Sequence, residues 1–106
     1  MAKYLWAASY STEGVKGVLK EGGSSRRDAI EKLVADLGGT LEAFYFGFGK
    51  DDVYVIADLP DNTAAAAVSL AVGGTGSVRI KTTVLLTPDE VDRAAHTTVG
   101  YRAPGK

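Results

Sequence analysis

Hydrophobic and polar residues alternate in four stretches of the chain. This period of two is typical of β-strands, whose successive side chains point to opposite faces of a sheet. The four stretches are residues 4–8, 40–48, 53–58 and 78–86. Elsewhere apolar residues recur every three or four positions, which predicts helices at residues 12–20, 25–37 and 63–72. Thr87-Pro88-Asp89-Glu90 has the residues of a capping box and predicts a short fourth helix that ends near His96.

The second and third strands form a hairpin that carries much of the aromatic content. All three phenylalanines and two of the five tyrosines lie in residues 40–58. The turn is predicted at Gly49-Lys50-Asp51-Asp52, because glycine permits positive φ and aspartate can bond to its own backbone.

The order of these elements predicts an α+β fold. Strand, helix pair, strand, strand, helix, strand is a ferredoxin-like βαββαβ arrangement, with an antiparallel four-stranded sheet and a split first helix. The short fourth helix is an extra C-terminal element. We expect one domain at residues 1–96, followed by a tail at 97–106 that has no apolar period and is ordered only by a partner.

Three of the four predicted strands are apolar or aromatic on both faces. A single layer of helices covers only one face of a sheet, and a soluble monomer exposes few large apolar patches. The pattern therefore predicts a homodimer packed sheet to sheet. The alternative is that the terminal helix and tail fold back over the second face. In the second strand, Leu41, Ala43 and Tyr45 are expected opposite Phe44 and Phe46, and Phe46→Asp should weaken the dimer if its face meets the partner.

Composition and charge exclude several classes of function. The net charge is −1 and the basic residues are scattered, so there is no electrostatic footprint for nucleic acid. The chain has no cysteine, which excludes disulfides and thiolate metal sites. Its lone histidine lacks partners at ligand spacing, and we expect neither a metal nor a cofactor. With no signal-peptide core and no membrane span, we expect a soluble cytoplasmic protein.

Several motifs, in this order and spacing, resemble the GYD domain family over residues 4–90. The similar features are Tyr4, Tyr10-Ser11-Thr12-Glu13-Gly14, Gly38-Gly39, Tyr45, Gly49-Lys50-Asp51-Asp52, Pro60-Asp61, Gly76 and Thr82. The family is named for a Gly-Tyr-Asp motif, whose tyrosine appears here as Asp51 while its glycine and aspartate are kept as Gly49 and Asp52. The resemblance implies a ferredoxin-like, dimeric α+β-barrel fold. It implies no reaction.

Six residues are candidate ligand-binding groups, each with a structural alternative. Tyr4, Trp6 and Tyr45 would line a cavity, or form core. Asp52 would mark a polar pocket edge, or cap its own turn. The remaining two are cations or potential cations: Arg79, with Lys81, would bind a carboxylate or phosphate, or protect a sheet edge, and His96 would be a general base, or a helix cap.

These candidates leave three hypotheses for function. The first is a homodimer that binds a small apolar or aromatic molecule in an aromatic-lined cavity. The second is a cofactor-free oxygenase or isomerase of the dimeric α+β-barrel type, using Trp6, Tyr45, Asp52 and His96. The third is a structural or assembly module. A cavity with an apolar lining would favour binding over catalysis.

Overall fold

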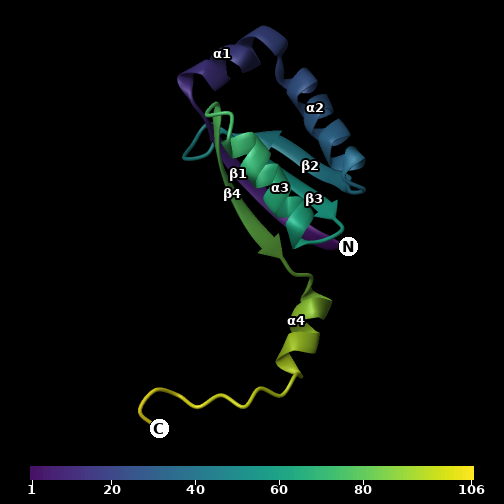
Figure 1. Cartoon of the computed structure of the whole chain (residues 1–106), viewed down its shortest axis with the longest axis vertical. Helices are drawn as coiled ribbons and strands as arrows, with labels where there is room; N and C mark the ends of the chain where they lie inside the picture. Colours follow the sequence, from purple (N-terminus) through teal and green to yellow (C-terminus); the bar gives the residue numbers. More distant parts are fainter.

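A computed structural model describes all 106 residues as an open four-stranded sheet with four helices. The elements are β1 (Ala2–Tyr10), α1 (Thr12–Glu21), α2 (Gly23–Asp36), β2 (Thr40–Phe46), β3 (Val53–Leu59), α3 (Asn62–Gly73), β4 (Val78–Leu85) and α4 (Pro88–Ala95). The strands lie in the order β2-β3-β1-β4, and every neighbouring pair is antiparallel. This order supports the predicted ferredoxin-like arrangement, with α1 and α2 in the place of the first crossover helix (Figure 1).

The core lies between one face of the sheet and helices α2 and α3. Alternate residues of β1 and β3 point into it, as the sequence pattern predicts. Its fully buried members are Tyr4, Trp6, Ala8, Val34, Val53, Val55, Ala57, Leu59, Ala65 and Val68. Their burial provides the main stabilisation of the fold, because burying apolar side chains contributes about 25 cal/mol per Å².

Helix boundaries follow the capping signals in the sequence. Asp61 caps α3 by accepting from the Ala64 N–H at 2.9 Å. Thr87 and Glu90 form the predicted capping box of α4. Gly38 has φ +83°, the left-handed conformation expected after α2. The start of α2 differs from the prediction, since the helix begins at Gly23 and the predicted start at Ser25 lies inside its first turn.

The side-chain faces of β2 were predicted wrongly. The β2–β3 register shifts between Leu41 and Ala43, because a bulge places one extra residue there. Beyond the bulge, Phe44 and Phe46 lie on the same face as Leu41, the helix side, and their rings meet edge to face at 5.3 Å. A methyl group on Gly23 of α2 would come within 2.9 Å of the Phe46 ring. Phe46 is therefore not on the face that a partner sheet would meet.

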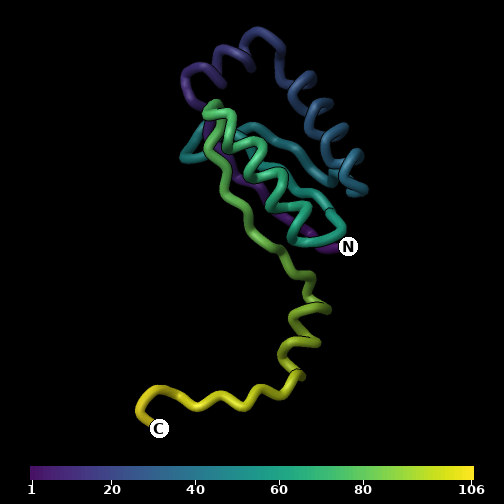
Figure 2. The backbone as a smooth tube through the Cα atoms, viewed as in Figure 1, coloured from purple at the N-terminus to yellow at the C-terminus, as the bar shows by residue number.

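The other face of the sheet is open. It carries the apolar residues Leu5, Ala7, Ala43, Tyr45, Tyr54, Ile56 and Leu85. Neither α4 nor the tail folds back over it, because both extend away from the body of the protein (Figure 2). This extension makes the longest dimension 57 Å, compared with 32 and 23 Å for the other two. None of the helices is long and apolar enough to cross a membrane.

Candidate functional site

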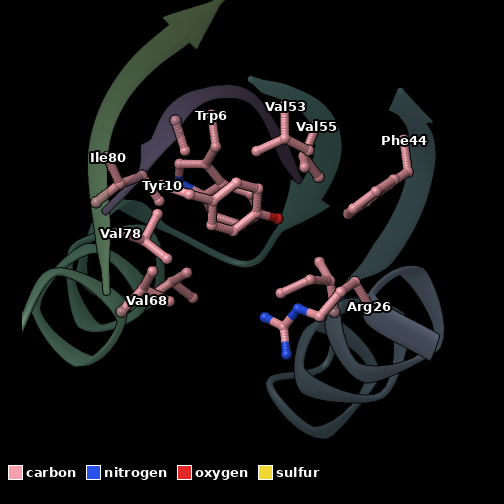
Figure 3. A pocket seen from close by; sticks show the side chains of 12 residues that line it. Trp6, Tyr10, Arg26, Phe44, Val53, Val55, Val68, Val78 and Ile80 are labelled. Carbon is pink, nitrogen blue, oxygen red and sulfur yellow. The ribbon is translucent and has the colours of Figure 1, made fainter. Parts of the chain in front are cut away.

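A small apolar chamber lies between the sheet and the two core helices. Side chains of β1 and β3 form its floor, and Val68 and Val72 of α3 and Ile30 of α2 form its walls. The chamber has a volume of about 50 Å³, and its twelve lining residues are Trp6, Ala8, Tyr10, Arg26, Ile30, Phe44, Val53, Val55, Val68, Val72, Val78 and Ile80. Figure 3 shows Trp6, Val53 and Val55 on the sheet side, with Arg26 opposite them. The space exists because small residues such as Ala8 leave room that larger side chains would fill.

Trp6 gives this chamber its one buried polar atom without a partner. The side chain is 2% exposed, and its Nε1–H donates no hydrogen bond within the protein. An unpaired buried donor costs about 1–3 kcal/mol, and most buried donors in proteins have partners. Less than 1 Å² of this nitrogen is exposed, so an acceptor would reach it only after a neighbouring side chain moves.

Tyr10 and Arg26 lie where the chamber adjoins a larger cleft. The cleft has a volume of about 600 Å³ and lies between α1, α2, α3 and the start of β4. Both residues line the chamber and the cleft, as do Val72 and Val78. In Figure 3 the Tyr10 hydroxyl is directed away from Ile80, into the space between the sheet and α2.

Burial and charge determine the state of these two side chains. Burial raises the pKa of the Tyr10 phenol above its ordinary value of 10.0, although the nearby Arg26 guanidinium opposes the shift. Tyr10 is therefore protonated at neutral pH and can donate a hydrogen bond. Arg26 forms an ion pair with Glu21 at 3.5 Å, and both side chains are partly exposed to solvent. Such a pair is weak and can be displaced.

The six residues predicted from the sequence do not form one site. Trp6 lines the chamber, whereas Tyr4 is buried beside it in the core and donates from its hydroxyl to Asn62 Oδ1 at 2.6 Å. Tyr45 is 70% exposed on the open face of the sheet. His96 lies at the C-terminal end of α4, away from the sheet, where Nδ1 contacts the Asp92 carbonyl oxygen at 2.7 Å (Figure 1).

Asp52 holds the hairpin loop against the end of β1. Its Oδ2 accepts from the Tyr10 N–H at 2.9 Å, and its own N–H donates to the Ala8 carbonyl oxygen at 2.8 Å. These bonds fix the backbone at Tyr10 and so place its ring beside the chamber. Asp52 therefore acts on the chamber through Tyr10, and it does not line the space itself.

Arg79 borders a polar depression at one end of the open face. The depression has a volume of about 470 Å³ and is lined by Ser9, Lys50, Asp51, Arg79, Ile80 and Lys81. Asp51 is 8% exposed there, accepting from Lys81 Nζ at 3.0 Å and Ser9 Oγ at 3.2 Å. The hydrogen bond from Lys81 is the main reason that the pKa of the Asp51 carboxyl is lowered from its ordinary value of 3.8.

This pairing makes the contribution of Lys81 to stability pH-dependent. Because the pKa of Asp51 is lower in the folded state, the stabilisation is present above pH 3.8 and is lost as the pH falls through the folded pKa. We expect Lys81→Met to destabilise the protein at pH 7, with the difference from wild type shrinking as the pH falls below 3.8. Urea unfolding from pH 7 to pH 2 checks this. An equally pH-dependent effect of Lys81→Met in an Asp51→Asn background would contradict it.

A protein-family model identifies the family to which this chain belongs. The GYD domain family model matches residues 4–95. The chain belongs to the GYD domain family. No curated protein and no solved structure matches the chain. In this GYD domain protein Asp51 accepts hydrogen bonds from Ser9 of β1 and from Lys81 of β4 at the edge of the open face.

Proposed function

We propose that this GYD domain protein binds a small molecule that has an oxygen acceptor at one end and an apolar remainder. The acceptor end enters the chamber and the remainder lies in the adjoining cleft. The unpaired N–H of Trp6, in an otherwise apolar chamber, is the observation that carries the proposal. An acceptor that meets this donor would recover part of the cost of burying it unpaired.

The dimensions of the two spaces set the size of this ligand. A chamber of about 50 Å³ is smaller than the cavity of about 150 Å³ that holds benzene in another protein, so a ring does not fit entirely inside. The chamber suits a group of a few heavy atoms. The cleft, at about 600 Å³, lies within the usual range of ligand pockets and offers the apolar side chains of Val18, Leu33 and Val72.

The surroundings of the chamber favour binding over catalysis. Among the residues proposed for an oxygenase or isomerase, Trp6 alone lines it, while Tyr45 and His96 lie on other parts of the molecule. General acid–base catalysis needs a titratable group within hydrogen-bonding reach of the substrate. No carboxylate or imidazole lines this chamber, and burial raises the pKa of its one phenol, Tyr10, which makes it a poor general base at neutral pH.

Replacing Trp6 with phenylalanine tests the proposal. Trp6→Phe keeps an aromatic ring but removes the N–H, so we expect its affinity for phenylacetamide to fall about tenfold, the effect of about 1.4 kcal/mol. Isothermal titration calorimetry measures this change. In the wild type, fluorescence of Trp6, the one tryptophan of the chain, should also respond to the ligand.

Tyr4→Phe is a matched control for the loss of a polar group. The Tyr4 hydroxyl bonds to Asn62 outside the chamber, so its removal should lower stability by about 1 kcal/mol and leave binding unchanged. Equal binding by Trp6→Phe and wild type would refute the role of the N–H. No binding by the wild type of either phenylacetamide or phenylacetate would refute the proposed function.

We also propose that two copies pair through their open sheet faces, forming the dimeric α+β barrel. The face carries apolar side chains on the central strands, including Leu5 of β1 and Ile56 of β3, and nothing in the same chain covers it. Face-to-face packing of two such sheets is a common way to bury them. A monomer in sedimentation at micromolar concentration would refute this pairing.

The position of α4 supports the same dimer. This helix has eight residues, buries none of its side chains, and leaves Val91 51% exposed. Isolated helices of this length are marginal in water, even with a good capping box. A second copy beside the open face would supply the apolar surface that α4 lacks within its own chain.

A further inference from the structure

The polar depression beside Asp51 forms a basic corner of the open face. It is lined by three cations, Lys50, Arg79 and Lys81, and by one carboxylate, so its formal charge is +2. Lys81 pairs with Asp51, whereas Lys50 and Arg79 form no ion pair within the chain, and both are exposed. These two cations are therefore free to meet carboxylates from outside the chain.

An acidic corner lies diagonally opposite on the same face. There the Lys3 amine lies 2.8 Å from the Glu42 carboxylate and 3.1 Å from that of Asp58, so the three groups have a formal charge of −1. The two acidic side chains remain 49% and 30% exposed. Glu42 is on β2 and Arg79 on β4, the two edge strands of the sheet. Arg79 pairs with Ser9 at one end of β1, and Asp58 pairs with Lys3 at the other end.

The distance between the corners keeps them from neutralising each other within one chain. Lys3 and Ser9 are about 20 Å apart along β1, at about 3.3 Å per residue. Exposed charges separated by more than about 8 Å are largely screened at physiological ionic strength. Attraction between a basic and an acidic corner therefore acts between two chains rather than within one.

We propose that these corners fix the orientation in which two copies pair, with the basic corner of each copy against the acidic corner of the other. This inference rests on the proposed dimer and names how its two sheets face each other. A two-fold axis repeats every contact, so Arg79 of each copy faces Glu42 of the other. An orientation in which like corners met would bring two basic corners together with no countercharge, and complementary charges select against such a register.

Reversing one charge at each corner tests this orientation. Arg79→Glu places two carboxylates together at both contacts of its homodimer, so we expect the dissociation constant to rise about tenfold, equivalent to about 1.4 kcal/mol. Glu42→Arg should weaken its own homodimer by a similar factor. An equimolar mixture of the two variants should dimerise about as tightly as wild type, because both contacts of the mixed dimer join opposite charges. Sedimentation velocity over a dilution series measures each constant, and a folding defect cannot produce this rescue.

Arg27→Glu is the matched control for net charge. Arg27 is an exposed residue of α2, on the helix side of the sheet, and its guanidinium lies 3.8 Å from the Asp28 carboxylate. The substitution changes the net charge by the same amount as Arg79→Glu, but away from the open face. It should therefore leave the dimer as tight as wild type.

The outcomes distinguish the orientation from the dimer on which it rests. A dimer that Arg79→Glu weakens no more than Arg27→Glu does would overturn the orientation and leave the dimer standing. The same conclusion would follow if the mixture of Arg79→Glu and Glu42→Arg dimerised no better than either variant alone. A wild-type protein that is monomeric at micromolar concentration would overturn both proposals.

Discussion

Replacing Gly39 with alanine is expected to destabilise the protein by about 3 kcal/mol. Gly39 connects α2 to β2, and its N–H donates to the Val34 carbonyl oxygen at 2.9 Å. A methyl group at this position would overlap the backbone oxygen of Asp58 in β3. It would also come within 2.8 Å of Leu59 Cδ2 and 3.1 Å of Val34 Cγ1, and both of those residues are fully buried.

The cost is large because none of these neighbours can yield easily. The Asp58 oxygen belongs to a central strand, whose position is fixed by pairing with β1 and β2. Close packing in the core transmits any shift to Val34 and Leu59. The methyl group would therefore either clash or displace the end of α2 from the sheet.

Urea unfolding measures the effect, with Gly17→Ala as the matched control. Gly17 is inside α1, and a methyl group there would meet no atom within 4 Å. Alanine is a better helix former by about 1 kcal/mol, so Gly17→Ala should stabilise the protein slightly. A Gly39→Ala protein as stable as wild type would show that the contact between α2 and β3 is loose.

The sequence was sufficient to predict the order and faces of most elements. In β1, β3 and β4 the alternation predicts which side chains share a face of the sheet, and the structure shows the same grouping. Regular strands preserve this alternation from end to end. The capping box at Thr87 located α4 for a similarly local reason. Such features depend on neighbours in the chain and need no knowledge of the fold.

The faces of β2 could not be predicted in this way. A bulge adds one residue and reverses the alternation beyond it, and no glycine or proline marks the shift between Leu41 and Ala43. The bulge depends on pairing with β3, a contact distant in sequence. It puts Phe44 and Phe46 on the helix side together with Leu41, from which a regular alternation would separate them.

The candidate site was predictable only in part. Trp6 was identified from its aromatic character, and Tyr10 could have been, because it continues the alternation of Tyr4, Trp6 and Ala8. Arg26 had no local signal, since an arginine in the first turns of a helix usually faces solvent. Its place beside the chamber depends on how α2 packs against the sheet, which the sequence pattern does not specify.

Replacing Ile56 with aspartate is expected to separate the proposed homodimer into monomers. Ile56 lies on β3 beside Leu5 of β1, so its side chain is on the two central strands of the open face. A carboxylate placed there would lose its water when the second sheet packs against it, and the nearby Lys3 amine is already paired with Glu42 and Asp58. We expect the dissociation constant to rise about a thousandfold, a loss of about 4 kcal/mol.

Sedimentation velocity over a dilution series measures this constant, and Leu70→Asp is the matched control. Leu70 is an aliphatic residue of α3 that is 77% exposed on the helix layer, away from the open face. The same charge at that position should leave the dimer intact. Circular dichroism should show both variants folded, because neither Ile56 nor Leu70 belongs to the buried core.

The pair of variants also separates a role of Ile56 in the dimer from a role in the fold of one chain. If Ile56 mattered only within its own chain, Ile56→Asp would lower the stability of a monomer and would not change the sedimentation of the protein. If a second copy covers the open face, the dissociation constant changes while the unfolding of the separated subunit hardly does. A wild-type dimer that Ile56→Asp leaves intact would place the interface elsewhere, because a charge at the centre of two packed sheets cannot be accommodated without cost.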